Sequence, residues 1–507
     1  MRDFYGPFAF VCASVFSLAA CSLNPEPETE VSVVEASSSS LSEAVVSSSN
    51  VGDSSGIPAS YKDIAYSEYK YVAPYPKDFR VEIAEGITGY IVSDRSLPLV
   101  NFTVYFDEPK VVSVISDEAA SEMVGSMIRR GAGGGISAHA LDDSLEFVSA
   151  GFSTSAGTFL STIDIDCLSK DFPMMLSLAR KVSTEPAFDK EQLEIVKANY
   201  VAAYERRFDT PSKILSALKA KVNYAPNPRL WDASLEEYKK VSVDDMKRLA
   251  AGVFSSRRIV FALSGDVDRD SAVAMLKEYF SSWKVDPSAA KPAPAPLTFV
   301  RKPGTYVVDK DISQANITIN QPFVRRPHPD YYPTAVASFI LGGGSFSSRL
   351  MNRVRSDEGL AYSVYSTVGN DYRDTALTTI ALQTKVETVD FALKLVFEEV
   401  EKLAKDGPSE EELSQAKKSL VESLPSLFDS PASTASIFAK GELLGKSDDH
   451  YLDYVKEINA VTADQVKSMV AKYFDRSRMT ISIVGPVEKF DALKPFTVVP
   501  LDSLEFR

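Results

Sequence analysis

The chain has few histidines, few cysteines and a deficit of positive charge. Its 507 residues include three histidines and three cysteines, and 55 Lys and Arg stand against 69 Asp and Glu, a net charge of −14. An acidic chain lacks the basic surface that nonspecific nucleic-acid binding needs, so we expect no nucleic-acid partner. Three cysteines cannot build a disulfide framework. His139, His328 and His450 lie far apart in the sequence, which argues against any mechanism that needs a histidine cluster.

The overall composition is that of a soluble globular protein. Hydrophobic residues make up 45% of the chain and charged residues 24%, which is enough apolar material for sizeable cores. At roughly 150 residues per domain, the length corresponds to about three domains, or to two large ones.

The amino-terminal segment, residues 1–20, has the pattern of a targeting signal. Residues 8–20 are apolar, but they are fewer than the roughly 20 that a membrane-spanning helix needs. They end in Leu18-Ala19-Ala20-Cys21, which resembles a bacterial lipobox. We therefore expect a lipoprotein signal peptide over residues 1–20 and a lipid on Cys21, with a plain secretory signal and a chance cysteine as the alternative. Nothing after Cys21 resembles an inner-membrane retention signal, so we expect a bacterial cell-envelope protein that faces the periplasm and contacts the outer membrane through its lipid alone.

Two stretches of biased composition divide the rest of the chain. Residues 21–65 are rich in Ser, Pro and Glu, which predicts a disordered tether behind the lipid. Residues 286–298 alternate Pro and Ala, a pattern typical of a semi-rigid linker. The linker separates two halves of similar size, residues 66–285 and 299–507.

The two halves match each other at one constant offset, the spacing between Phe188 and Pro408. Phe188–Leu193 corresponds to Pro408–Leu413, and both segments predict helix starts with acidic residues in the first turn. Ser242 and Thr462 each precede an amphipathic helix as capping residues. Two further pairs keep the same offset: Asp209–Pro211 with Asp429–Pro431, and Phe254–Gly265 with Phe474–Gly485. The body of the chain is therefore a duplication.

Within each repeat, strands come first and helices follow. Residues Val81–Asp94 and Leu99–Phe106 alternate between apolar and polar side chains, and residues 158–167 predict a further strand. A helix is expected over residues 117–130, and we interpret the glycine run 131–135 as the loop that ends it, with a substrate-contacting loop as the alternative. This order predicts an α+β fold of two tandem repeats, each a mostly antiparallel sheet with helices packed on one face.

The sharpest motif spans residues 341–364 in the second repeat, where a glycine turn, a helix and the segment Gly359-Leu-Ala-Tyr362 follow one another. On the residues alone, Arg349 reads as a solvated helix residue and Tyr362 as a core residue. Together with the tandem repeats over residues 70–486, the motif resembles the pitrilysin/insulinase family, which includes the mitochondrial processing peptidase. The resemblance implies one half of a clamshell, in which Arg349 and Tyr362 reach into the chamber and bind the substrate backbone.

The catalytic motif of that family is missing. Its peptidases carry His-x-x-Glu-His on a first-repeat helix, where two histidines bind zinc and the glutamate is the general base. Aligning the helix through Gly131 places the motif on Glu122, Gly125 and Ser126, so both histidines and the base are absent. The downstream ligand would fall near Glu205. Solvated helix faces explain Glu122 and Glu205 better than a weak site for a hard cation, so we expect no metal or other cofactor in this chain.

Three functions remain open. The first is a non-catalytic subunit, inactive on its own, that forms a heterodimer with a zinc-bearing homologue and supplies Arg349 and Tyr362 for cleavage of unfolded or extended peptides. In that case the zinc belongs to the partner. The second is an envelope lipoprotein that uses the peptidase fold as a scaffold or peptide-binding protein without proteolysis. The third, an independent metallopeptidase with a rewired site, is opposed by the missing histidines.

Overall fold

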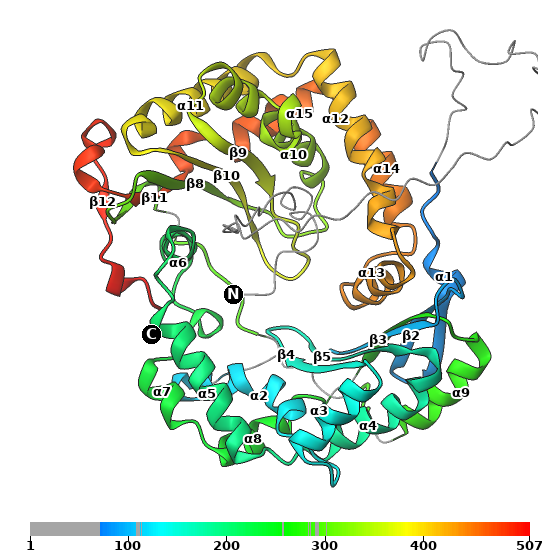
Figure 1. Ribbon diagram of the computed structural model, residues 1–507. Helices are drawn as coiled ribbons and strands as arrows, with labels where there is room; N and C mark the ends of the chain where they lie inside the picture. The colour runs from blue at the N-terminus through cyan, green and yellow to red at the C-terminus, as the bar shows by residue number, and fades with distance from the viewer. Residues whose placement is uncertain are drawn as a thin grey trace, which may run out of the picture. The chain divides into compact units, whose positions relative to one another are not determined.

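Each half of the chain folds into a six-stranded sheet, and five strands of each sheet follow one common order (Figure 1). The computed structural model describes residues 71–107, 112, 114–255, 258–281, 283, 285–288, 294–300 and 302–507. The expected signal peptide, the lipidated Cys21 and the tether lie outside the described residues. All elements discussed below belong to one unit, Ala73–Arg507.

The first sheet has the order β1-β2-β6-β3-β5-β4. Strands β2 and β6 pair in parallel, and every other pair of neighbours is antiparallel. The alternating run over Val81–Asp94 is two strands rather than one, because the chain turns between them at Gly86, whose φ is +76°. The strands are β1 (Arg80–Ala84), β2 (Ile87–Ser93), β3 (Leu99–Phe106), β4 (Gly151–Ala156), β5 (Ser161–Leu168) and β6 (Ile259–Gly265).

Helices of the first repeat gather below this sheet in Figure 1, except for α6 and the short α1. A large apolar core fills the space between them and the sheet, and Phe102, Met123 and Phe261 are among its fully buried members. The helices are α1 (Pro76–Phe79), α2 (Glu118–Arg130), α3 (Ala138–Phe147), α4 (Phe172–Thr184), α5 (Lys190–Glu205), α6 (Pro211–Asn223), α7 (Leu235–Lys240), α8 (Val243–Ala250) and α9 (Arg269–Phe280).

Apart from its edge strand, the second sheet repeats this topology, with the order β12-β7-β11-β8-β10-β9. The edge strand β12 pairs in parallel with β7, whereas β1 pairs antiparallel with β2. Strand β7 pairs in parallel with β11, as β2 does with β6, and β8 lies antiparallel between β11 and β10. Its own helices cover one face around a second apolar core. The strands are β7 (Gly304–Asp309), β8 (Gln314–Phe323), β9 (Ala361–Val368), β10 (Ala376–Lys385), β11 (Thr480–Gly485) and β12 (Thr497–Val498). The helices are α10 (Tyr331–Ser338), α11 (Val389–Asp406), α12 (Glu410–Glu422), α13 (Pro431–Leu443), α14 (His450–Ala460) and α15 (Ala463–Tyr473).

Helix starts confirm the internal repeat. Ser242 and Thr462 both form capping boxes, at the starts of α8 and α15. Thr210 and Ser430 both cap helices whose first residue is proline, at the starts of α6 and α13. The same local chemistry at equivalent positions thus starts the same helix in each half, and the predicted α+β fold of two tandem repeats is confirmed.

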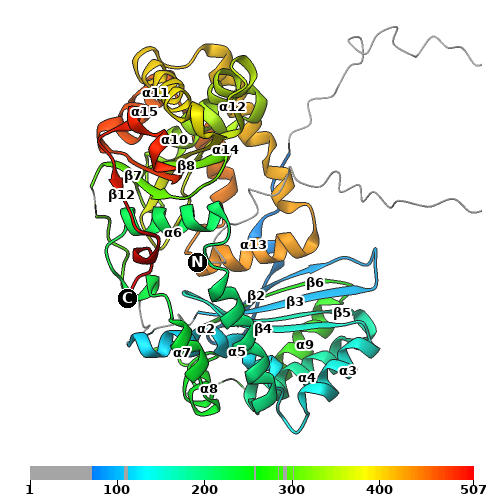
Figure 2. The same cartoon turned by 60° about the vertical axis from the view of Figure 1, so that its left-hand side comes forward.

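The two repeats exchange one helix each. Helix α13 of the second repeat packs on the first sheet, against β2, β3 and β6, and α6 of the first repeat packs on the second sheet, against β7, β8 and β11 (Figure 1 and Figure 2). Each sheet therefore carries its own helices on one face and a helix of the other repeat on the opposite face. The sequence predicted the first layer but not this reciprocal exchange. None of the described helices has the length and apolar character needed to cross a membrane.

Candidate functional site

The degenerate zinc motif lies on α2, and its polar groups are already engaged. The carboxylate of Glu122 accepts a hydrogen bond from the Tyr238 hydroxyl at 2.7 Å, and the Glu122 carbonyl accepts one from Tyr200 at 2.8 Å. Burial and the neighbouring Glu122 carboxylate raise the pKa of Tyr238 far above its usual value, so this hydroxyl remains a donor. The Ser126 hydroxyl donates to the Met123 carbonyl at 3.0 Å. The two bonds from Tyr200 and Tyr238 hold α2 to α5 and α7.

Gly125 stands where the family resemblance places the general base, and strand β4 closes that position. A Cβ atom on Gly125 would lie 2.2 Å from the backbone nitrogen of Ala156, and the Thr154 hydroxyl donates to the Gly125 carbonyl at 2.6 Å. The second repeat has the same contact, because a Cβ on Gly342 would lie 2.5 Å from the nitrogen of Ser366 on β9. A glutamate side chain at position 125 would require β4 to move.

The downstream candidate, Glu205, does not complete a metal site. It is the exposed last residue of α5, and no group of three His, Cys, Asp or Glu side chains within the described ranges could hold a metal ion. Zinc in catalytic sites of proteins takes three protein ligands, and Glu122, Gly125 and Ser126 offer one carboxylate that is already hydrogen-bonded. The residues at the expected position therefore do not fit zinc.

A contact that the sequence did not reveal closes this region from outside. Glu505 accepts hydrogen bonds from the Tyr204 hydroxyl at 2.9 Å and from Arg207 Nε at 2.7 Å. The backbone of Phe506 bonds to Asp232 in both directions, and its ring is buried. The carboxyl-terminal residues Glu505 and Phe506, which belong to the second repeat, thus cover the end of α5 and the residues just before α7. They have no motif that would have identified them in the sequence.

The glycine run after α2 is a structural loop. Gly131 follows the last residue of α2, and the backbone of Gly134 donates to the Glu185 carbonyl at 3.0 Å. A Cβ on Gly133 would lie 2.0 Å from the same carbonyl oxygen, so only glycine fits there. This loop pairs with the connection between α4 and α5, as expected of a helix-terminating loop.

Arg349, the first residue of the predicted substrate clamp, is held by α12. Its Nε and Nη2 donate to the two carboxylate oxygens of Glu412 at 2.6 and 2.8 Å, and Nη2 also donates to the Gly407 carbonyl at 3.2 Å. Glu412 accepts the Ser409 backbone N–H as well, within the capping box of α12. The hydrogen bond with Arg349 lowers the pKa of Glu412, and the same bond raises the pKa of Arg349. Arg349 Nη1 has no hydrogen bond to any described residue.

Tyr362, the second residue of the clamp, sits at an irregularity of β9. Ser363 lies opposite Gln383 and Ala361 opposite Thr384, so Tyr362 is an extra residue in the ladder, a β-bulge. Bulges in strands re-aim side chains and are frequent beside functional sites. Two π-helical segments, Phe339–Gly343 and Met351–Asp357, precede the strand, and such segments are also frequent at functional sites. The motif of the second repeat is therefore locally unusual, in contrast to the closed α2 region.

Comparison with known proteins agrees with this geometry. A family model described as "Peptidase M16 inactive domain" matches residues 240–420. The Helicobacter pylori protein named non-peptidase homolog YmxG is 26% identical over 344 residues, which cover 65% of this chain and 78% of that protein. The Bacillus subtilis protein named uncharacterized zinc protease YmxG is 25% identical over 304 residues, which cover 59% of this chain and 72% of that protein.

Solved structures share the fold. A peptidase M16 inactive domain from Pseudomonas fluorescens matches with a TM-score of 0.68 at 25% identity, covering 80% of this chain and 97% of that domain. The periplasmic protease PqqL of Escherichia coli matches with a TM-score of 0.65 at 17% identity, and the match covers 80% of this chain and 46% of PqqL. This chain thus spans about half the length of PqqL. The chain is therefore similar to the M16 peptidase family, the pitrilysin/insulinase family, and resembles its inactive members in lacking the His-x-x-Glu-His zinc motif.

Proposed function

We propose that this chain is the non-catalytic subunit of a processing-peptidase-like zinc metallopeptidase of the bacterial cell envelope. It pairs with a zinc-bearing homologue and supplies Arg349 and Tyr362 to the substrate backbone. The substrates are unfolded or extended peptides. The lipid on Cys21 holds the pair at the outer membrane, facing the periplasm.

The observation that carries the proposal is the contrast between the two repeats. In the first repeat, Gly125 packs against β4 and the zinc motif is gone. In the second, Arg349 and Tyr362 lie in the segment 341–364, which resembles the family motif, and Tyr362 stands at the bulge of β9. A zinc-bearing partner contributes the metal, the activated water and the carboxylate base, which are the parts missing here.

The arrangement of Arg349 restricts how the clamp works. Because Glu412 and Gly407 occupy Nε and Nη2 of Arg349, the peptide carbonyl accepts its hydrogen bond from Nη1. Tyr362 then donates its phenolic hydrogen toward the oxygen that becomes negative in the transition state. Arg349 thus both anchors the clamp to α12 and offers one donor to the peptide.

Reconstitution with a zinc-bearing relative tests the clamp. Replacing Tyr362→Phe removes one donor to the developing oxyanion, which should lower kcat/KM for peptide cleavage about a hundredfold. Tyr365→Phe on the same strand is the matched control and should leave the rate unchanged. Arg349→Lys should also slow cleavage, because an ammonium cannot reproduce the planar fork. The chain alone should show no chelator-sensitive cleavage.

The second candidate function, a scaffold or peptide-binding lipoprotein without proteolysis, is favoured by one observation. On this second function, the bidentate bond to Glu412 at the start of α12 is the whole role of Arg349. If Tyr362→Phe and Arg349→Lys leave a fully active pair unaffected, the clamp is refuted and the scaffold function takes its place.

Co-purification from native membranes identifies the partner, and Cys21→Ser should release the complex from those membranes. Unchanged membrane association of a normally processed variant would refute the lipid anchor.

A further inference from the structure

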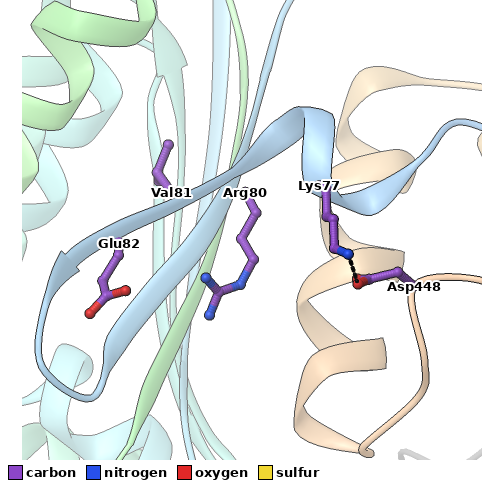
Figure 3. Close-up of a pocket in the computed structure, with 5 residues that line it drawn as sticks. All are labelled: Lys77, Arg80, Val81, Glu82 and Asp448. Carbon is purple, nitrogen blue, oxygen red and sulfur yellow. Dashed lines mark ion pairs between the residues drawn. The ribbon is translucent and has the colours of Figure 1, made fainter.

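Two adjoining hollows lie between the first strands of the first repeat and the end of α13 in the second. The outer hollow, of about 410 Å³, is lined by Lys77, Arg80, Val81, Glu82 and Asp448 (Figure 3). The inner hollow, of about 250 Å³, shares Arg80 and Asp448 with it and continues past the connection from α13 to α14. Both hollows lie away from the zinc motif on α2 and from the element of the second repeat that bears Arg349.

Most charged groups around the two hollows are paired. Lys77 Nζ lies 3.2 Å from Asp448, and the two side chains meet at the rim in Figure 3. Arg80 donates to both carboxylate oxygens of Glu442, at 3.1 and 3.2 Å. Glu442 also accepts hydrogen bonds from Thr88 and Tyr90, so its acceptor capacity is filled.

Lys446, which lines the inner hollow, is the exception. Across the described ranges, no carboxylate lies within ion-pair distance of its ammonium, and no hydrogen bond reaches its Nζ. The ammonium lies 5.1 Å from the centre of the Tyr372 ring and 5.7 Å from that of Tyr451. Aromatic faces attract a cation but do not neutralise it.

A second uncompensated cation increases the positive potential here. Arg326 is 4% exposed. Among the described residues, its guanidinium donates only to the neutral Asn370 and Tyr332 side chains, and its Nε has no partner. Burial and Arg326 together lower the pKa of Lys446 to about 8. His450, the third basic group, adds no charge at neutral pH, because burial, Lys446 and Arg326 lower its pKa to about 3. The Lys446 ammonium therefore has no counter-ion in the described part of the chain, and Arg326 adds to the positive charge around it.

The remaining lining defines the shape of an anion that would fit. Apolar surface comes from residues of α1, α13 and α14: Pro76, Ile437, Phe438 and Tyr451. Ser447 adds an exposed hydroxyl. Glu442, Asp448 and Glu82 disfavour a polyanion, because each would repel extra negative charge. One free ammonium beside an apolar wall instead matches a single carboxylate on an apolar body.

We propose that the inner hollow is a binding site for carboxylates with an apolar body, in which the Lys446 ammonium pairs with the carboxylate. Such a group occurs in free aliphatic and aromatic acids and at the carboxyl terminus of a peptide that ends in an apolar residue. The site lies apart from the substrate clamp. Its existence does not depend on the proposed pairing with a zinc-bearing subunit.

Calorimetric titrations of the full chain with three probes distinguish a free acid from a peptide carboxyl terminus as the ligand. The probes are 3-phenylpropionate, N-acetyl-Ala-Ala-Phe and the carboxamide of the same peptide. Both carboxylates should bind, and the carboxamide should bind at least about tenfold more weakly, because it cannot pair with the ammonium. A peptide that binds more tightly than phenylpropionate identifies the peptide terminus as the source. Equal binding of acid and amide, or no binding by either acid below about 10 mM, overturns the proposal.

Substitution of the lysine tests the assignment directly. Lys446→Met should weaken carboxylate binding by about tenfold or more, and Lys446→Arg should retain most of it. Lys456→Met, an exposed lysine of α14 that lines neither hollow, is the control for the loss of one positive charge. Retained affinity in a folded Lys446→Met variant would refute the site.

The pH dependence provides a second readout. The free chain loses the Lys446 proton as the pH rises through about 8, whereas the bound carboxylate holds it. Affinity should therefore fall above this pH, with proton uptake on binding. The charged and titratable groups that face Lys446 are Arg326, Tyr372, Glu442, Asp448, His450 and Tyr451. The pKa of Glu442 is about 2, that of His450 about 3 and that of Tyr451 about 12, and burial also raises the pKa of Tyr372, so these four groups do not titrate near pH 8. A pH-independent affinity would contradict the pairing with Lys446.

Discussion

Helices α6 and α13 occupy equivalent places in the two repeats, yet their contacts differ in chemistry. Where α13 lies on the first sheet, the contact is an apolar cluster: Tyr90, Tyr105, Val260, Ala262, Ala435, Phe438, Ala439 and Leu443. Where α6 lies on the second sheet, apolar residues fill only part of the contact: Ile214, Leu218, Val222, Val308, Val484 and Leu504. The remainder is polar. The duplication thus fixed the geometry of the helix exchange, while the side chains within it diverged.

The polar part of the α6 contact contains groups that are costly to bury. Lys219 Nζ approaches the Thr379 hydroxyl at 3.4 Å, and burial lowers the pKa of this lysine. The hydroxyls of Thr318 and Ser482 are buried without a hydrogen-bond partner in the described part of the chain. At the offset that relates the two repeats, Lys219 corresponds to Ala439 and Ser482 to Ala262. The same positions are therefore apolar in one contact and polar in the other.

The α13 contact has one strong polar anchor at its end. Glu442 accepts hydrogen bonds from four residues of the first repeat: Arg80, Thr88, Tyr90 and Arg258. Its counterpart on α6 is Val222. Each helix therefore combines an apolar and a polar part, but the polar part is satisfied under α13 and incompletely satisfied under α6. We expect the two repeats to be held together mainly by α13.

The largest effect is expected from truncating the aromatic centre of the α13 contact. Phe438 packs against Phe79, Tyr90 and Phe428. Phe438→Ala should lower the free energy of unfolding by about 4 kcal/mol, and Leu218→Ala, its counterpart on α6, by about 3 kcal/mol. Urea denaturation of both variants measures the difference. A larger loss for Leu218→Ala would reverse our ranking of the two contacts.

The next effect concerns Glu442. Burial alone would raise its pKa, but the hydrogen bonds from Arg80, Tyr90, Thr88 and Arg258 lower it to about 2. Because the folded pKa is depressed, the stabilisation is fully present above the ordinary pKa of 4.5 and is lost as the pH falls toward 2. Glu442→Gln should cost about 3 kcal/mol at neutral pH, since it leaves two arginines unpaired.

The pH dependence of this cost is the decisive measurement. The stability difference between Glu442→Gln and the parent chain should shrink as the pH falls from 4.5 toward 2. Val222→Ala, the counterpart on α6, should cost about 2 kcal/mol from lost apolar burial, with no pH dependence of its own. A constant cost for Glu442→Gln across this range would show that the carboxylate charge contributes nothing.

The smallest effect has the opposite sign. Ser482→Ala removes a buried hydroxyl that lacks a partner among the described residues and should raise the free energy of unfolding by about 1 kcal/mol. The reverse exchange in the first repeat, Ala262→Ser, should lower it by about 2 kcal/mol, because it buries a new hydroxyl in an apolar cluster. Thermal unfolding of the Ser482→Ala and Ala262→Ser variants measures both changes in stability. Destabilisation by Ser482→Ala would mean that the hydroxyl is satisfied after all.

Local features were predicted well because their causes are local. The caps at Ser242 and Thr462 and the helix over residues 117–130 depend on neighbouring residues alone, and the structure has each of them. The run over Val81–Asp94 was not divided correctly, because alternation continues across the turn at Gly86. Gly125 was predicted to stand at the position of the missing general base, but the sequence contained no sign that β4 lies against it.

The sequence by itself determined the duplication, the α+β order of elements and the loss of the zinc motif, since each depends on residue identity at fixed spacing. Only the tertiary structure decided which helix covers which sheet, that Glu412 holds Arg349 and that Lys446 has no counter-ion among the described residues. These features join residues far apart in the chain, and burial and pairing depend on the three-dimensional environment rather than on spacing. The same helix start at Thr210 and Ser430 therefore leads to two contacts of different chemistry.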